Sequence, residues 1–113
     1  FLAALAVVLL SGPAMAFNCS GTITTGGTAQ TIFTSGNVHG LLLMNNSANL
    51  MCVSFSGNAA TIAGTNCGSG SWVLQPGSAT ASGGSFSNPS NIAVSTVSII
   101  SSTTGDRFSC ERQ

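Results

Sequence analysis

Short runs of β-branched and aliphatic residues, each bounded by turn residues, constrain this chain more than any other sequence feature. They recur about every eight to twelve residues after position 17, a spacing that is typical of strands in an all-β domain. No segment beyond position 17 has the length and periodicity expected of a helix. About seven or eight short strands of this kind predict one small antiparallel β-sandwich or jelly roll.

Three runs in the first half have specific predicted arrangements. The Gly26–Gly27 pair separates residues 22–25 from residues 28–34 and predicts a two-residue hairpin turn between two strands. The continuous apolar run Leu41–Met44 is typical of a strand that is buried on both faces. Alternation within Leu50–Phe55 predicts a strand with two different faces. One face holds Met51, Val53 and Phe55, and the other holds Leu50, Cys52 and Ser54.

The second half is predicted to contain one long loop among its strands. Ser78–Asn91 is rich in Gly, Ser and Asn and includes an Asn-Pro dipeptide, which favours a loop. Downstream, the alternation of apolar residues slips between Val94 and Val97, which indicates a β-bulge or a bend. Arg107–Arg112 is predicted to be the last strand.

The N-terminus has the pattern of a secretory signal peptide. Phe1–Leu10 is apolar, and Ala14–Ala16 supplies the small-residue pattern that precedes a cleavage site. The apolar run is too short to span a bilayer. We therefore predict an apolar helical leader at residues 1–16, lacking a few N-terminal residues, and a domain at residues 17–113. The alternatives are a buried N-terminal helix or an uncleaved anchor, which would be the only contact with a membrane.

Four cysteines in an exported domain of this length predict two disulfides, for which three connectivities exist. We favour Cys19–Cys110 with Cys52–Cys67, because the two ends of a domain often lie close together. A zinc site is disfavoured, since no two cysteines have the spacing of a zinc knuckle and His39 is the only histidine. No metal or other cofactor is therefore predicted.

All four formally charged residues lie in the last eight positions: Asp106, Arg107, Glu111 and Arg112. Exposed local ion pairs are expected between Asp106 and Arg107 and between Glu111 and Arg112. General acid–base catalysis needs positioned ionisable groups, which the rest of the chain almost lacks, so we predict that the protein is not an enzyme. Two arginines do not make a surface for nucleic acid. The formal net charge of zero instead favours self-association or contact with a host surface.

Two aromatic residues are candidate contact residues. Phe86 lies in the predicted loop, where binding residues often occur, and is expected to be exposed. Trp72 is expected to pack over the core or a disulfide rather than to stack on a sugar. His39 is expected to make only local hydrogen bonds. Asn18 and Asn45 each begin an N-glycosylation triplet, which chance alone also produces in a chain rich in Asn and Ser.

Five short motifs follow one another between residues 22 and 112: Gly26–Gln30, Gly40–Asn46, Leu50–Gly57, Leu74–Gly77 and the acidic Glu111 of the last strand. In this order they resemble small β-sandwich domains of tailed-phage virions, described as minor head, decoration or fibre-associated proteins. His39 stands where that family usually has Arg. The resemblance implies a structural role in a virion, without a cofactor.

Together these observations predict a non-enzymatic structural or surface-attachment protein that is exported and stabilised by disulfides. Its expected partners are copies of itself or a protein of a virion or cell surface. The expected location is secreted, periplasmic or cell-surface, with the virion as an alternative. The alternative function is a secreted binding module for a carbohydrate or a host surface, which would use Trp72 and the Ser78–Asn91 loop.

Overall fold

The computed structural model describes residues 17–34, 36–78, 81, 83–88 and 92–113. These residues form thirteen short strands, all of them paired antiparallel, and no helix. The all-β class is thus confirmed. The predicted helical leader at residues 1–16 lies outside the described residues.

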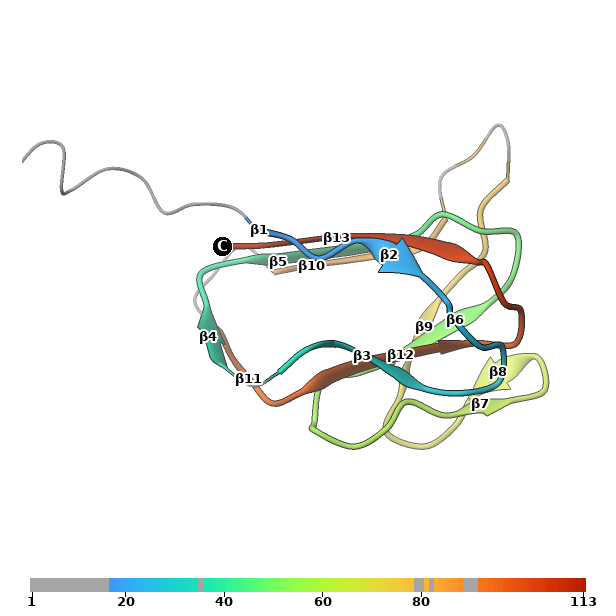
Figure 1. Cartoon of the computed structure of the whole chain (residues 1–113), viewed down its shortest axis with the longest axis horizontal. Helices are drawn as coiled ribbons and strands as arrows, with labels where there is room; N and C mark the ends of the chain where they lie inside the picture. The colour runs from blue at the N-terminus through green and yellow to red at the C-terminus, as the bar shows by residue number, and fades with distance from the viewer. Residues whose placement is uncertain (1–16, 35, 79–80, 82, 89–91) are drawn as a thin grey trace, which may run out of the picture.

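Two larger sheets lie one above the other (Figure 1). In the first, named the β5 sheet, four strands follow in the order β1 (Phe17–Asn18), β13 (Arg107–Arg112), β5 (Leu41–Asn45) and β10 (Ser85–Asn88). A short fifth strand, β2 (Gly21–Thr22), also pairs with β13. In the second, named the β6 sheet, the order is β3 (Gln30–Phe33), β12 (Val97–Ser101), β6 (Met51–Ser54) and β9 (Trp72–Leu74).

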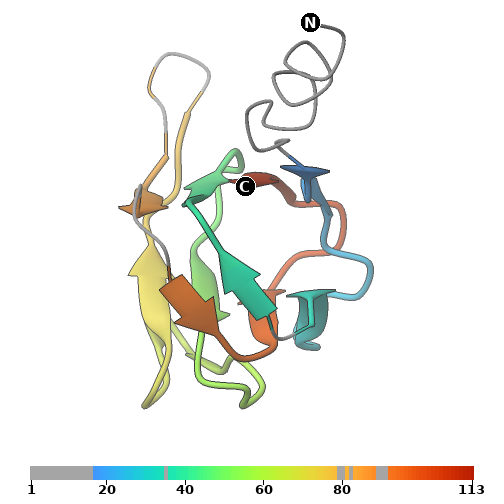
Figure 2. The same ribbon diagram turned by 90° about the vertical axis from the view of Figure 1, so that its left-hand side faces the viewer.

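Two small strand pairs complete the described part of the chain. Strands β4 (Gly36–Val38) and β11 (Ile92–Val94) pair at one end of the molecule, the end that faces the viewer in Figure 2. Strands β7 (Ile62–Ala63) and β8 (Asn66–Cys67) form a hairpin beside the β6 sheet (Figure 1).

The chain crosses between sheets where the sequence predicted a simple hairpin. Strands β2 and β3 flank Gly26 and Gly27, but β2 pairs with β13 and β3 pairs with β12, so the predicted hairpin is wrong. A Cβ atom at Gly26 would lie 2.8 Å from the backbone nitrogen of Thr104, which leaves room only for glycine. Gly26 therefore permits a close backbone approach, whereas Gly27 has a φ of 80° and lies in a turn closed by the Thr28 N–H, which donates to the Thr25 carbonyl oxygen at 3.2 Å. The turn is present, but it connects two sheets instead of two strands of one sheet.

A second irregularity agrees with the sequence. The pairing of β12 with β3 shifts register between Val97 and Ser98, which confirms the predicted bulge or bend. Strands β11 and β12 also belong to different sheets. Because such crossings divide predicted strands into shorter ones, the structure has more strands than the seven or eight expected.

The main hydrophobic core lies between the two larger sheets. The β5 sheet contributes Leu41, Leu43, Phe108 and Cys110, and the β6 sheet contributes Met51, Val53, Leu74, Val97 and Ile99. Ile23 completes the set of buried residues. A second, smaller core of Cys52, Ala60 and Ile100 covers the opposite face of the β6 sheet.

Burial of β5 differs from the prediction. Leu41 and Leu43 are buried, but Leu42 between them is 51% exposed, so burial on both faces is wrong for this strand. In β6 the predicted division into two faces is confirmed, since Met51 and Val53 lie in the main core and Cys52 in the second. Both faces of β6 are nevertheless buried.

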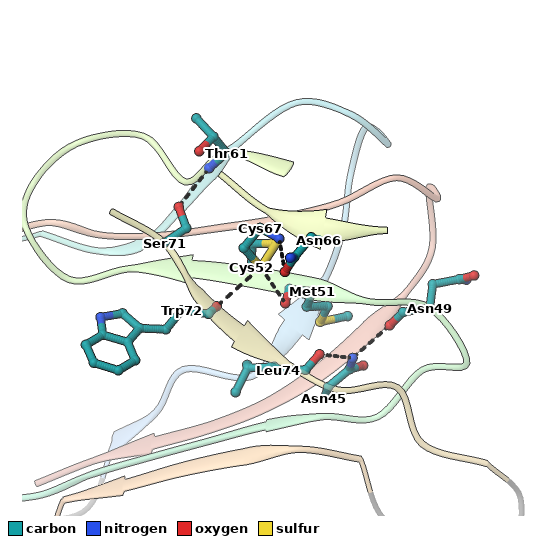
Figure 3. The surroundings of a disulfide bond; sticks show 10 residues. All are labelled: Asn45, Asn49, Met51, Cys52, Thr61, Asn66, Cys67, Ser71, Trp72 and Leu74. Atoms are coloured by element: carbon teal, nitrogen blue, oxygen red, sulfur yellow. Dashed lines mark hydrogen bonds between the residues drawn. A yellow bond between two sulfur atoms is a disulfide. The ribbon is translucent and has the colours of Figure 1, made fainter. Parts of the chain in front are cut away.

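Both predicted disulfides are present. Cys19 pairs with Cys110 across 91 residues, with their Cα atoms 4.7 Å apart. Cys52 pairs with Cys67 across 15 residues, at a Cα separation of 5.6 Å (Figure 3). The reason given for the pairing also holds, because β1 and β13 bring the start of the domain beside its end.

Candidate functional site

The first candidate surface is the edge strand β9. Trp72 is 67% exposed and Val73 is 38% exposed, whereas Leu74 is buried in the main core. Trp72 lies opposite Val53 and Val73 opposite Cys52, so the two exposed side chains are on opposite faces of the strand. Strand β9 is the last of its sheet, so no further strand of that sheet lies beyond these two side chains.

The position of Trp72 corrects the prediction that it packs over the core or a disulfide. Figure 3 shows its indole pointing away from the sulfur atoms of Cys52 and Cys67. What contacts the disulfide is the Trp72 carbonyl oxygen, which lies 3.7 Å from Cys67 Sγ. The disulfide thus supports the backbone of β9 and leaves the indole free for contact with another molecule.

Hydrogen bonds hold both ends of β9 in place (Figure 3). Ahead of the strand, the Thr61 backbone N–H donates to Ser71 Oγ at 3.0 Å. At its end, Asn45 Nδ2 donates to the Leu74 carbonyl oxygen at 3.0 Å. The exposed pair Trp72 and Val73 is therefore presented on a fixed strand rather than on a mobile loop.

The second candidate surface is the outer face of the β5 sheet. Leu42 and Met44 point outward from β5, because they alternate with the buried Leu41, Leu43 and Asn45. A hollow of about 440 Å³ lies over them. Polar residues of the neighbouring strands form its sides: Ser85 and Ser87 from β10, Ser109 and Glu111 from β13, and Asn18 and Ser20 from the N-terminal segment.

Phe86 does not occupy an exposed loop, which corrects the second contact prediction. It lies in β10, opposite the buried Leu43, and packs against the main core. Its ring centroid is 4.6 Å from that of Phe55. Sequence reasoning placed Phe86 in a loop because Ser, Gly and Asn surround it, but pairing with β5 turns these residues into an edge strand.

The charged residues also differ from the prediction of exposed local pairs. Asp106 is buried and accepts hydrogen bonds from Ser101 Oγ and, at 3.0 Å, from Asn49 Nδ2. The guanidinium of Arg112 lies over two rings, 4.9 Å from the centroid of Phe33 and 5.5 Å from that of Phe17. Asp106 and Arg112 therefore each have contacts within the fold that the sequence did not predict.

The other residues singled out in the sequence differ in exposure, and some of their hydrogen-bond partners are distant in sequence. His39 is exposed, and its backbone N–H donates to the Gln113 carbonyl oxygen at 2.6 Å. Asn18 is exposed, so the first glycosylation triplet is accessible. Asn45 is fully buried, with Nδ2 donating to the carbonyl oxygens of Asn49 and Leu74. The second triplet is therefore closed to modification in the folded protein.

The described residues hold no group of three or more His, Cys, Asp or Glu side chains that could bind a metal ion. A helix long and apolar enough to cross a membrane does not occur in this part of the chain.

Sequence reasoning missed the outer face of the β5 sheet. The apolar run Leu41–Met44 concealed it, because a continuous run does not reveal which of its residues another layer covers. The polar residues beside Leu42 come from strands far apart in sequence, so only the strand order brings them together. One available signal was the alternation of Arg107, Ser109 and Glu111 in the last strand, which indicated a solvent-facing side of the same sheet.

No protein-family model, curated protein or solved structure matches the chain.

Proposed function

We propose that this chain is a non-enzymatic structural protein, exported and stabilised by its two disulfides, that acts by association between copies of itself. The finer architecture fits this role as a two-layer β-sandwich in which β9 is the terminal strand of its sheet. The observation that carries the proposal is the exposed pair Trp72 and Val73 on edge strand β9.

Edge strands of soluble domains are usually protected by charged side chains, proline or a covering element. Strand β9 has no charged residue, and its neighbours Ser71 and Gln75 are uncharged as well. All four formal charges of the chain lie in residues 106–112, in and just before β13 of the other sheet. Two β9 strands can therefore approach without charge repulsion and bury their indole and valine side chains against each other.

The two disulfides fit the export that we propose. Two disulfides are compatible with an oxidising compartment such as the periplasm or the extracellular space. Cleavage after Ala16 would give a mature chain starting at Phe17, the first residue of β1. A role in a virion or on a cell surface, as the resemblance to tailed-phage domains implies, uses the same mechanism of contacts between uncharged faces.

The test uses residues 17–113 produced with both disulfides formed. Size-exclusion chromatography with light scattering over a concentration series should show a dimer or larger oligomer. The double variant Trp72→Ser and Val73→Thr should be a monomer, because it removes the apolar contact and keeps the strand. Leu42→Ser is the matched control, since it removes an apolar side chain of similar exposure from the other surface and should leave the oligomer intact.

A wild-type protein that stays monomeric at every concentration would contradict self-association. An oligomer that persists in the β9 double variant and dissociates in Leu42→Ser would place the interface on the β5 sheet and would contradict association through β9. N-terminal sequencing of the exported product tests the leader separately, with Phe17 as the expected first residue.

A further inference from the structure

The side chains on the outer face of the β5 sheet lie in two regular rows across its strands. Four residues lie directly opposite one another on successive strands: Ser87 of β10, Leu42 of β5, Glu111 of β13 and Asn18 of β1. A parallel row of Ser85, Met44 and Ser109 lies two residues along. An apolar ridge on the central strand β5 is therefore bordered on both sides by hydroxyl, amide and carboxylate groups.

The hollow over this pattern continues in both directions along the sheet. A depression of about 150 Å³ adjoins it and shares Leu42, Ser87 and Glu111 with it. A third depression, of about 410 Å³, shares Ser20 and Ser109 with the central hollow and reaches Arg107. The three form one elongated trough, which is the shape needed for a chain-like ligand rather than for a single compact molecule.

Several polar groups of the trough are available to a ligand. Three exposed residues of the trough have side chains that make no hydrogen bond to another residue in the described part of the chain: Ser85, Ser87 and Glu111. Other side chains fix the walls. Asn46 Nδ2 donates to Ser109 Oγ, and Ser20 Oγ accepts from the Cys110 N–H at 2.8 Å, next to the Cys19–Cys110 disulfide.

We propose that this trough binds a neutral oligosaccharide chain. A pyranose ring has an apolar C–H face, which fits the ridge of Leu42 and Met44, and a rim of hydroxyl groups, which fits the serine, asparagine and glutamate side chains beside that ridge. The only formal charges that line the trough are Glu111 toward one end and Arg107 at the other. Glu111 beside Leu42 disfavours an anionic chain there.

The site is independent of the proposed self-association, because it lies on the other sheet and shares no residue with β9. Each proposal can therefore fail without the other. The backbone strands that carry the trough are joined to one another by ladder pairing, so binding needs no ordering of a loop.

The test is affinity electrophoresis of the disulfide-bonded protein in gels that contain a soluble neutral polysaccharide, namely β-glucan, xylan, mannan or starch. Gels with alginate or polygalacturonate serve as anionic comparisons. At least one neutral polymer should retard the protein, and the anionic polymers should not. The corresponding hexasaccharide is then titrated calorimetrically against the wild type and variants.

Leu42→Asp should abolish retardation, because it places a second carboxylate on the ridge. The double variant Ser87→Ala and Glu111→Gln should weaken hexasaccharide binding by about tenfold or more, since it removes one hydroxyl and one charged acceptor. Trp72→Ser, on the other surface, should bind as the wild type does. Circular dichroism checks that every variant is folded.

The proposal is overturned if no neutral polymer retards the protein, or if only the anionic polymers do. It is also overturned if folded Leu42→Asp binds as well as the wild type. Loss of binding in Trp72→Ser with full binding in Leu42→Asp would assign the glycan to β9 instead of the trough.

Discussion

The outer faces of the two larger sheets differ in what covers them. On the β6 sheet, the segment that includes Ala60 and the β7–β8 hairpin packs on the outer face, and Cys52 and Ile100 are buried there in a second core. On the β5 sheet, none of the described segments forms an equivalent second core, and Leu42 is 51% exposed. Burial consequently alternates along β5 but is continuous along β6 and β12.

This difference fits a division between packing on the β6 sheet and the ligand binding that we propose for the β5 sheet. The β6 sheet uses both faces for packing, and the Cys52–Cys67 disulfide fastens the covering hairpin to it. The β5 sheet contributes one face to the main core, and its other face carries the hollow in which we propose that a ligand binds. Its own disulfide, Cys19–Cys110, fixes the N-terminal segment at the side of the trough instead of covering the face.

Removing the disulfides should give the largest effects and should rank them by loop length. The chain-entropy model gives a cost of about 4–5 kcal/mol for Cys19→Ala with Cys110→Ala, which opens a loop of 91 residues, and about 3 kcal/mol for Cys52→Ala with Cys67→Ala, which opens a loop of 15. Urea unfolding under non-reducing conditions measures both.

The reverse ranking would sharpen the comparison in a different way. If loss of Cys52–Cys67 costs more free energy of unfolding than loss of Cys19–Cys110, the covering hairpin has detached and the second core has been lost with it. Binding of a hydrophobic dye to the folded variant would reveal that exposed face.

Alanine substitutions at neighbouring positions should next separate the two sheets. Leu43→Ala should cost about 2–5 kcal/mol, because Leu43 is buried in the main core, whereas Leu42→Ala should cost less than about 0.5 kcal/mol. Ile99→Ala and Ile100→Ala should both cost about 2–5 kcal/mol, since both faces of β12 are covered. Chemical denaturation of the four variants provides the comparison.

If Ile100→Ala lowers the free energy of unfolding only slightly, the β7–β8 hairpin contributes little to the stability of the β6 sheet. If Leu42→Ala instead causes a large loss in the free energy of unfolding, the outer face of the β5 sheet is covered in solution, for instance by another copy.

Local features of the sequence predicted much of the fold. Turn-bounded β-branched runs predicted the all-β class, and the last strand was predicted at Arg107–Arg112, where β13 lies. The slip between Val94 and Val97 predicted the irregularity found at Val97 and Ser98. Both disulfides followed from the tendency of domain ends to meet. Each of these inferences depends on short-range pattern or on general chain geometry.

The candidate surfaces could not be predicted in the same way. Exposure of Leu42 and Trp72 depends on which segment covers a strand, and the covering segments are distant in sequence. Phe86 was misplaced for a related reason, because the pairing of β10 with β5 overrides the loop-forming tendency of its neighbours. The continuous apolar run of β5 has an exposed face, whereas both of the faces predicted for β6 are buried. A sequence pattern shows which residues share a face of a strand, but it does not show whether another segment covers that face.

Removal of a buried polar side chain that connects the two sheets should give the next-largest loss in the free energy of unfolding. Asn45 at the end of β5 donates to Asn49 O at 2.7 Å and to Leu74 O of β9 at 3.0 Å, so it connects the two sheets. Asn45→Ala should lower the free energy of unfolding by about 1–3 kcal/mol, because the Leu74 carbonyl loses its side-chain donor in a buried site.

Asn46→Ala is the matched control one residue along. Asn46 is exposed and bonds only to Ser109 Oγ among side chains of the described residues, so its loss should change stability by no more than about 0.5 kcal/mol. Equal effects at the two positions would show that Asn45 does not connect the sheets energetically.

The smallest predicted effect separates the two faces of β13 itself. Arg112 follows the inward positions of Phe108 and Cys110 and lies over the rings of Phe17 and Phe33, which belong to β1 and to β3 of the other sheet. Arg107 is on the outward face and exposed. Arg112→Gln should therefore cost about 0.5–1 kcal/mol, the usual range for an exposed cation–π contact, and Arg107→Gln should be close to neutral. Thermal unfolding of the two variants measures the difference, and equal melting temperatures would show that the guanidinium of Arg112 does not help to hold β1 and β3 together.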